Sequence, residues 1–168
     1  MDTINKFYIY CPTCKNSLEK KNINGEYVLT CNNCGFTFWN NPKPVVSFLF
    51  IKKGKILLLQ RAHEPLRDYW CFPGGFMRYE ETPKEAVKRE VKEETGLNIQ
   101  IDGLVGVYRI DNDPRGVHID IIYSGTGIGE IKLSTENNDY AFYESDKLPE
   151  LIAYKHREAI RNWLEKKR

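Results

Sequence analysis

Apolar residues follow two spacings along this chain, one typical of strands and one typical of helices. Short apolar runs bounded by turn residues predict strands at residues 45–51, 55–60, 70–72, 103–110, 117–125 and 140–144. Near the carboxyl end, Ala159/Trp163 and Ile160/Leu164 lie four residues apart. This spacing predicts a helix over residues 154–167 with one buried stripe. Strands mixed with helices favour a layered α/β or α+β fold.

A second helix is expected over residues 82–95, because both of its ends carry strong signals. Thr82 suits the N-cap, Pro83 suits the first helical position, and Glu85 lies three residues after the cap to complete a capping box. Gly96 is placed to end the helix in the left-handed conformation. The bounds of this helix are therefore predicted without any functional argument.

The first forty residues differ from the rest of the chain. They hold all the paired cysteines and no long apolar run, and Pro42 and Pro44 then flank a single lysine. Such a segment favours an extended path between units. We expect two domains, a small module over residues 1–40 and a larger domain over residues 41–168.

Composition excludes several classes of protein. The 25 basic and 23 acidic residues give a net charge of +2, so the total charge predicts neither a nucleic-acid nor a membrane partner. Residues 1–12 lack the pattern of a secretory signal, and the longest apolar run, residues 45–51, is far shorter than the roughly 20 residues of a spanning helix. We expect a soluble, cytoplasmic protein.

Four cysteines form two C-x-x-C pairs, Cys11/Cys14 and Cys31/Cys34, separated by sixteen residues. This spacing predicts a Zn²⁺ site, and four thiolates would complete a structural, tetrahedral one. Asn24-Gly25 followed by the apolar residues of 26–30 predicts a hairpin between the pairs. The segment looks like a zinc ribbon. The alternative is four reduced cysteines that pack as small apolar residues, as we expect of the unpaired Cys71.

Glu90, Glu93 and Glu94 fall within an arc of about 100° on the predicted helix 82–95. They lie in its last two turns, where the helix dipole disfavours negative charge. A bound divalent cation would reverse that balance. The alternative is a surface helix that is merely rich in glutamate.

The segment from Gly75 to Leu97 resembles the Nudix box. Its fixed positions are filled by Gly75, Glu81, Arg89, Glu90, Val91, Glu93, Glu94, Gly96 and Leu97. The resemblance implies a mixed sheet between helices and hydrolysis of a nucleoside diphosphate linked to another moiety. It also implies that Glu90, Glu93 and Glu94 hold Mg²⁺ or Mn²⁺, and that Arg89 orients Glu90 and pairs with Glu81.

Two more features carry over from this family. The Gly74-Gly75 turn would let backbone carbonyl groups approach the metal. A late loop in the family often supplies a further acid, and Glu136 matches its position, with Asp139 and Glu144 as rivals.

A zinc ribbon before a Nudix domain is similar to two groups of enzymes. NADH pyrophosphatases carry a Pro-rich motif after the box, and residues 98–116 contain nothing like it. Shorter ribbon-bearing proteins that hydrolyse ADP-ribose or FAD are the better match. Candidates for contact with the base, the ribose or the phosphates are Phe76, Tyr79, Tyr108, Arg109, Arg115 and His118.

Two other functions stay open at this point. Lys15, Lys20 and Lys21 form a modest basic patch on the ribbon, so the chain could bind nucleic acid, with a nucleotide-capped RNA end as a hybrid case. A sensor that binds a nucleotide sugar without cleaving it would have no need of the glutamates. The sequence leaves the oligomeric state open, a homodimer included.

Overall fold

The computed structural model describes residues 8–167, so the first seven residues of the expected ribbon lie outside the described part. The chain divides into two compact units, Met1–Pro42 and Lys43–Arg168.

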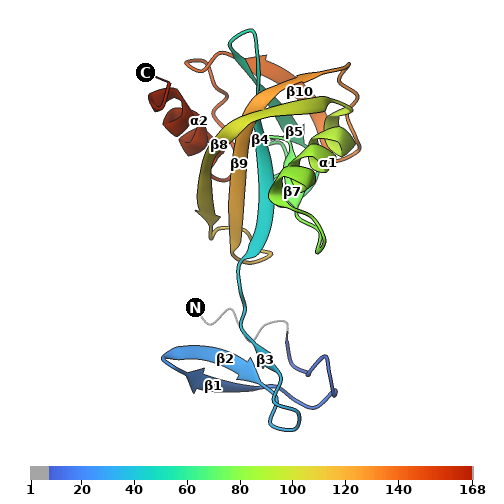
Figure 1. Cartoon of the computed structure of the whole chain (residues 1–168), viewed down its shortest axis with the longest axis vertical. Coiled ribbons are helices and arrows are strands. Elements are labelled where there is room, and N and C mark those ends of the chain that lie inside the picture. Colours follow the sequence, from blue (N-terminus) through green and yellow to red (C-terminus); the bar gives the residue numbers. More distant parts are fainter. Residues whose placement is uncertain (1–7, 168) are drawn as a thin grey trace. The chain divides into compact units, whose positions relative to one another are not determined.

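The amino-terminal unit contains a three-stranded antiparallel sheet of β1 (Glu19–Ile23), β2 (Glu26–Thr30) and β3 (Thr37–Phe38), in that order (Figure 1). Asn24 and Gly25 connect β1 to β2 with φ angles of 52° and 90°. Two successive positive φ values belong to the turns that match the twist of a hairpin. The predicted hairpin is therefore confirmed.

The second unit is built on a mixed sheet. Within residues 43–167 the strand order is β10-β5-β4-β9-β8, and only β4 and β9 pair in parallel. The strands are β4 (Lys43–Lys52), β5 (Lys55–Arg61), β8 (Asn98–Ile110), β9 (His118–Ile128) and β10 (Asn137–Tyr143). Two short strands extend it, because β6 (Trp70–Cys71) pairs with β5 and β7 (Gly74–Phe76) pairs with β4.

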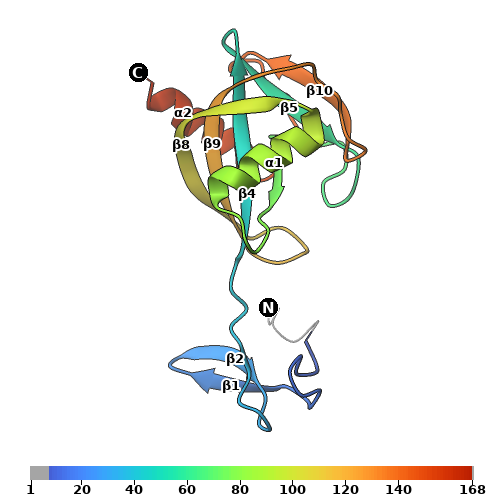
Figure 2. The ribbon, with the colours of Figure 1, turned by 45° about the vertical axis from the view of Figure 1, so that its right-hand side comes forward.

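The two helices cover opposite faces of this sheet, α1 (Pro83–Thr95) on one and α2 (His156–Glu165) on the other (Figure 2). The alternation of β4 explains the arrangement. Phe48 packs in the core cluster that includes Val87 of α1, whereas Leu49 packs in the cluster that includes Ile160 of α2. The expected fold, a mixed sheet between helices, is confirmed.

The ends of α1 match the sequence signals. The Thr82 hydroxyl accepts from the Glu85 N–H, the Glu85 carboxylate accepts from the Thr82 N–H, and Gly96 adopts φ 73°. The carboxyl-terminal helix is shorter than the predicted 154–167, because Tyr154 has φ 54° and the helix begins only at His156. Neither helix of residues 8–167 is long and apolar enough to cross a membrane.

Candidate active site

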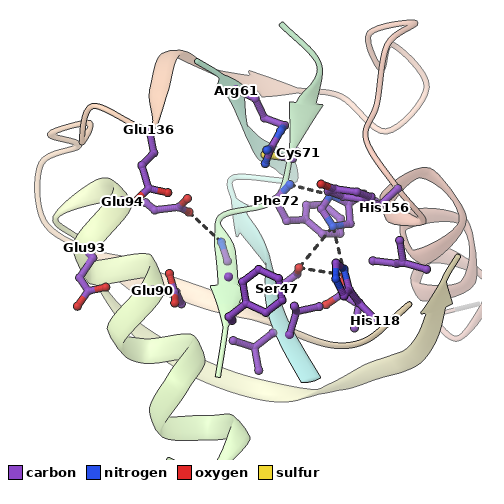
Figure 3. A pocket seen from close by; sticks show the side chains of 18 of the residues that line it. Ser47, Arg61, Cys71, Phe72, Glu90, Glu93, Glu94, His118, Glu136 and His156 are labelled. Atoms are coloured by element: carbon purple, nitrogen blue, oxygen red, sulfur yellow. Dashed lines mark hydrogen bonds and ion pairs between the residues drawn. The ribbon is translucent and has the colours of Figure 1, made fainter. Parts of the chain in front are cut away.

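A pocket of about 390 Å³ lies beside α1, and its walls come from β4, β7, β9, α1 and the segment that precedes β10. Glutamates occupy one side of this pocket. Ser47, His118 and His156 gather at the opposite end (Figure 3). The pocket therefore has an acidic wall, made of Glu90, Glu93, Glu94 and Glu136, and a separate end where Ser47 and the two histidines lie beside Asp120.

Glu94 is the most buried glutamate of the acidic wall, with 7% of its surface exposed. Its Oε2 accepts a hydrogen bond of 2.8 Å from the backbone N–H of Gly74, and its Oε1 accepts one of 3.5 Å from Nδ2 of Asn137. Burial raises the pKa of Glu94 to about 8, against the Gly74 hydrogen bond, and the charges of Glu136 and Glu90 add to the rise. This carboxyl group therefore holds its proton near neutral pH unless a cation comes to it.

Glu90 lies one helical turn before Glu94, against the turn that begins β7. A Cβ atom at Gly75 would stand 2.7 Å from Cδ of Glu90, so a larger residue there would displace this carboxylate. Burial raises the pKa of Glu90, with Arg89 opposing the rise and the charges of Glu93 and Glu136 adding to it. Glu90 and Glu94 thus share an environment that disfavours their negative charge.

Arg89 forms several hydrogen bonds along the outer side of the acidic wall. It donates two hydrogen bonds to Glu81, one of them of 2.8 Å to Oε2, and one of 2.6 Å to Oε1 of Glu90. The Arg89 hydrogen bonds hold the pKa of Glu81 at about 2. A further bond of 3.1 Å to the carbonyl oxygen of Phe76 ties the same guanidinium to β7. A planar five-donor group is suited to bridging several acceptors in this way.

Glu93 differs from its two neighbours on α1, because half of its side-chain surface is exposed. One carboxylate oxygen accepts from Arg89 at 2.9 Å and the other from Arg78 at 3.1 Å. Figure 3 shows Glu93 on the outer side of the helix, whereas Glu90 and Glu94 lie toward β7. The shared arc predicted from the sequence therefore contains two inner carboxylates and one on the rim.

Glu136 comes to the same wall from a different part of the chain. It precedes β10, lines the pocket and points toward Glu94 (Figure 3). Its two rivals lie elsewhere: Asp139 is exposed on β10, and Glu144 pairs with Lys55 and Lys147. Of the three late acids, the structure brings only Glu136 to the pocket.

The remaining predicted contact residues divide into two sets. Phe76, Arg115 and His118 line the pocket, as do Gly74 and Gly75. Tyr108 and Arg109 do not line it, so the structure does not bring these two predicted contact residues to the pocket. They lie on β8, the edge strand beyond β9, where Tyr108 packs in the core cluster of α2 and Arg109 projects to solvent beside Asp111. Tyr79 is fully exposed and also lies outside the pocket.

Three pocket residues were missed by sequence reasoning: Ser47, Asp120 and His156. Each is buried and polar. The available signal was a polar residue at every second position of an otherwise apolar strand, as at His118 and Asp120 of β9. Polar residues on the buried face of a strand require partners, and here the partners come from β4 and α2.

The four paired cysteines form a second candidate site, in the amino-terminal unit. All four are free, and their sulfur atoms lie within 4.8 Å of one another. Ligands about 2.3 Å from a tetrahedral zinc ion stand roughly 3.8 Å apart, so this spacing fits such an ion. Hydrogen bonds from the side chain and backbone of Asn16 lower the pKa of Cys14 to about 5, whereas, against a backbone hydrogen bond at Phe36, the neighbouring thiols raise the pKa of Cys34 to about 12. Within residues 8–167, no other group of three or more potential ligands is this close.

Comparison with known proteins identifies the larger unit. The family model of the NUDIX domain matches residues 41–165. An ADP-ribose pyrophosphatase of Methanocaldococcus jannaschii is 37% identical over 131 residues, which cover 77% of each chain. The putative ADP-ribose pyrophosphatase YjhB of Bacillus subtilis is 30% identical, over 66% of this chain and 54% of its own length. The crystal structure of a NUDIX hydrolase from Nitrosomonas europaea superimposes with a TM-score of 0.81 at 23% identity, over 94% of this chain and 90% of that one.

Proposed function

This chain is a pyrophosphohydrolase of the NUDIX domain family, and from that membership we propose that it hydrolyses the pyrophosphate bond of a nucleoside diphosphate linked to another moiety. ADP-ribose and FAD are the favoured substrates, and Mg²⁺ or Mn²⁺ is the proposed cofactor. The observation that carries the proposal is the acidic wall, in which the buried Glu94, the partly buried Glu90 and Glu136 face one pocket.

The residues of the wall fit a hard divalent cation. Carboxylate and carbonyl oxygens are the donors that Mg²⁺ prefers. Glu90 and Glu94 both have raised pKa values because burial and neighbouring acids disfavour their charge. A cation bound between the two carboxylates would remove that penalty. We propose that Glu90 and Glu94 hold the ion, with oxygens from Glu136 and the Gly74-Gly75 turn nearby and Glu93 joining from the rim.

Bound there, the metal would neutralise the phosphate oxygens and lower the pKa of the attacking water. The chain supplies the remaining functions. Arg89 fixes the position of Glu90 and keeps Glu81 ionised. Arg78 stands at the rim of the pocket, with most of its side chain exposed, where it can meet a phosphate. One glutamate of the wall accepts the proton of the attacking water.

The proposed test is a substrate panel with products identified by mass. It should contain ADP-ribose, FAD, NADH, dinucleoside polyphosphates and nucleoside triphosphates, with Mg²⁺ present. The wild-type protein should release a nucleoside monophosphate from ADP-ribose or FAD, and Glu94→Gln should lower the rate by several orders of magnitude. Glu165→Gln, an exposed acid on α2, is the matched control and should keep the wild-type rate. If none of the three proteins hydrolyses any substrate of the panel, the proposal is refuted.

We also propose that residues 1–40 form a zinc ribbon whose ion is structural, and that residues 41–168 form the hydrolase domain. A segment of forty residues buries too little surface to fold easily alone, and zinc can supply on the order of 10 kcal/mol of apparent folding free energy. Nucleic-acid binding by the ribbon stays a prediction. Two of its lysines already have partners, since Lys20 lies 4.6 Å from the ring centre of Tyr27 and Lys21 donates to Asn32.

A further inference from the structure

The end of the pocket opposite the acidic wall contains two buried polar atoms without a partner. They are Oδ1 of Asp120 and Nε2 of His118, and neither atom has a hydrogen-bond partner among the described residues. Asp120 is 1% exposed and His118 is 2% exposed. Both residues line the pocket and lie two positions apart on β9, so their side chains share one face of the strand. A buried polar atom left unpaired costs about 1–3 kcal/mol, so such a pair indicates a missing ligand.

The other oxygen of Asp120 is already engaged. Its Oδ2 accepts a hydrogen bond of 3.0 Å from the hydroxyl of Ser47 and lies 3.4 Å from Nε2 of His156. The backbone N–H of Phe72 donates to Nδ1 of His156 at 2.9 Å, which places the imidazole proton on Nε2. His156 therefore cannot take a proton from Ser47, and this trio does not form a serine nucleophile. It holds Asp120 in place with Oδ1 as its free acceptor.

His118 offers a second acceptor. Its Nδ1 lies 3.7 Å from Oδ2 of Asp113, whose pKa Arg115 holds at about 2 in spite of burial. Burial lowers the pKa of His118, so its ring is neutral near pH 7. The neighbouring carboxylate favours the proton on Nδ1, which leaves Nε2 with a lone pair.

The ligand for this end of the pocket must therefore bring hydrogen-bond donors. A phosphate is excluded because Asp120 would repel it, and a carbonyl group offers only another acceptor. Two hydroxyl groups on neighbouring carbons of a sugar supply two donors at a short, fixed separation. Phe76 packs edge-on against His118, with ring centres 5.1 Å apart, and Arg115 lies 5.2 Å from the Phe76 ring. The Phe76 ring gives the sugar a flat apolar boundary.

The position of Asp120 relative to the acidic wall also suits a sugar attached to a phosphate at that wall. Ser47 pairs across the sheet with Gly74, which donates to Glu94, and Asp120 lies on the strand at the other side of β4. Two strand spacings, roughly 10 Å, separate β7 from β9. This is comparable with the length of one phosphate and one pentose.

We propose that Asp120 and His118 form a subsite for a vicinal pair of sugar hydroxyls of the substrate, an inference that rests on the proposed hydrolysis of a sugar-bearing nucleoside diphosphate. Two sugars share this chemistry, the ribose of the nucleoside and the distal ribose of ADP-ribose. The subsite makes the enzyme selective for ribosyl over deoxyribosyl substrates.

The test compares three substrates on three proteins in Mg²⁺. The substrates are ADP-ribose, its analogue with 2′-deoxyadenosine, and its analogue with a distal 2-deoxyribose. The proteins are the wild type, Asp120→Asn, and Asp102→Asn as an exposed control of the same chemistry on β8. We expect the wild type and the control to lose about 10- to 100-fold in kcat/KM on one deoxy substrate, which identifies the sugar in the subsite. Asp120→Asn should lower kcat/KM on ADP-ribose and reduce the discrimination to less than about threefold.

The outcomes separate the subsite from the proposed function. Equal kcat/KM of the wild type on all three substrates would overturn the subsite while leaving the hydrolase intact. Retained discrimination in Asp120→Asn would overturn it as well. If the wild type hydrolyses neither these three substrates nor any other substrate of the panel above, the proposed function is refuted instead. If Asp120→Asn fails to fold, the kcat/KM values of the wild type on the three substrates still test the subsite. His118→Phe then takes the place of Asp120→Asn, with an apolar ring in place of the second acceptor.

Discussion

Replacement of Glu94 by glutamine should stabilise this protein at alkaline pH when no Mg²⁺ or Mn²⁺ is present, although it should abolish hydrolysis. The pKa of this buried carboxyl group is raised from an ordinary 4.5 to about 8 in the folded state. A raised pKa means that the folded protein holds the proton more tightly than the unfolded chain. Its favourable contribution is therefore complete below about pH 4.5 and is lost as the pH rises through about 8. Glutamine has no proton to lose, so the variant should lack this loss.

The size of the effect follows from the same pKa values. Each unit of pKa difference corresponds to about 1.36 kcal/mol, so the change from 4.5 to about 8 amounts to roughly 3–5 kcal/mol. Glutamine keeps an oxygen for the N–H of Gly74, which accounts for the closest hydrogen bond of Glu94. The free energy of unfolding of Glu94→Gln should therefore exceed that of the wild type by a few kcal/mol at pH 9 and by much less at pH 5.

Urea denaturation between pH 5 and pH 9 measures this difference. Trp70 and Trp163 report on the second unit by fluorescence, and dialysis without a chelator removes Mg²⁺ while sparing the cysteine site. Glu165→Gln should follow the wild type at every pH. Added Mg²⁺ should stabilise the wild type at pH 9 and leave Glu94→Gln nearly unchanged. An equally steep loss of stability with rising pH in Glu94→Gln and in the wild type would refute the assignment of this loss to Glu94.

Three further changes test other contacts. Arg89→Lys removes the guanidinium that hydrogen-bonds both Glu81 and Glu90. We expect a loss of about 2–3 kcal/mol in the free energy of unfolding and at least a tenfold drop in kcat. A change in KM alone would contradict the role of Arg89 in positioning Glu90. Gly75→Ala places a methyl group against the Glu90 carboxylate. Metal affinity measured by calorimetry should fall, while the free energy of unfolding should fall by less than about 1 kcal/mol. Unchanged metal affinity would contradict the proposed role of the Glu90 carboxylate beside Gly75. Cys31→Ser removes one of the four clustered thiols, so elemental analysis should find no bound zinc and the amide NMR signals of residues 8–40 should broaden. Undisturbed signals would show that the ribbon folds without its ion.

The parts of this molecule that sequence could predict are those with local causes. The ends of α1 depend on Thr82, Glu85 and Gly96, all within or beside the helix, and they lie where the sequence predicts. The spacing of Glu90 and Glu94 follows from helical geometry in the same way. The cysteine cluster is also local, because each C-x-x-C pair shares one turn and a single hairpin joins the two.

The rest depends on contacts between distant segments. Ser47, Asp120 and His156 meet across β4, β9 and α2, and no spacing in the sequence relates them. On the rim, Glu93 accepts a hydrogen bond from Arg78, fifteen residues earlier, and helical spacing alone does not predict this contact. Tyr108 packs on the α2 side of the sheet, and periodicity alone does not tell which face of an edge strand meets the pocket.

We propose above all that Glu90 and Glu94 bind a divalent cation beside the Gly74-Gly75 turn. Anomalous diffraction from crystals soaked in Mn²⁺ with a non-hydrolysable ADP-ribose analogue tests it directly. We expect a manganese peak about 2.0–2.4 Å from oxygens of both glutamates and in contact with the diphosphate. A bound analogue with no peak between these carboxylates, or with its manganese held elsewhere, would contradict the account.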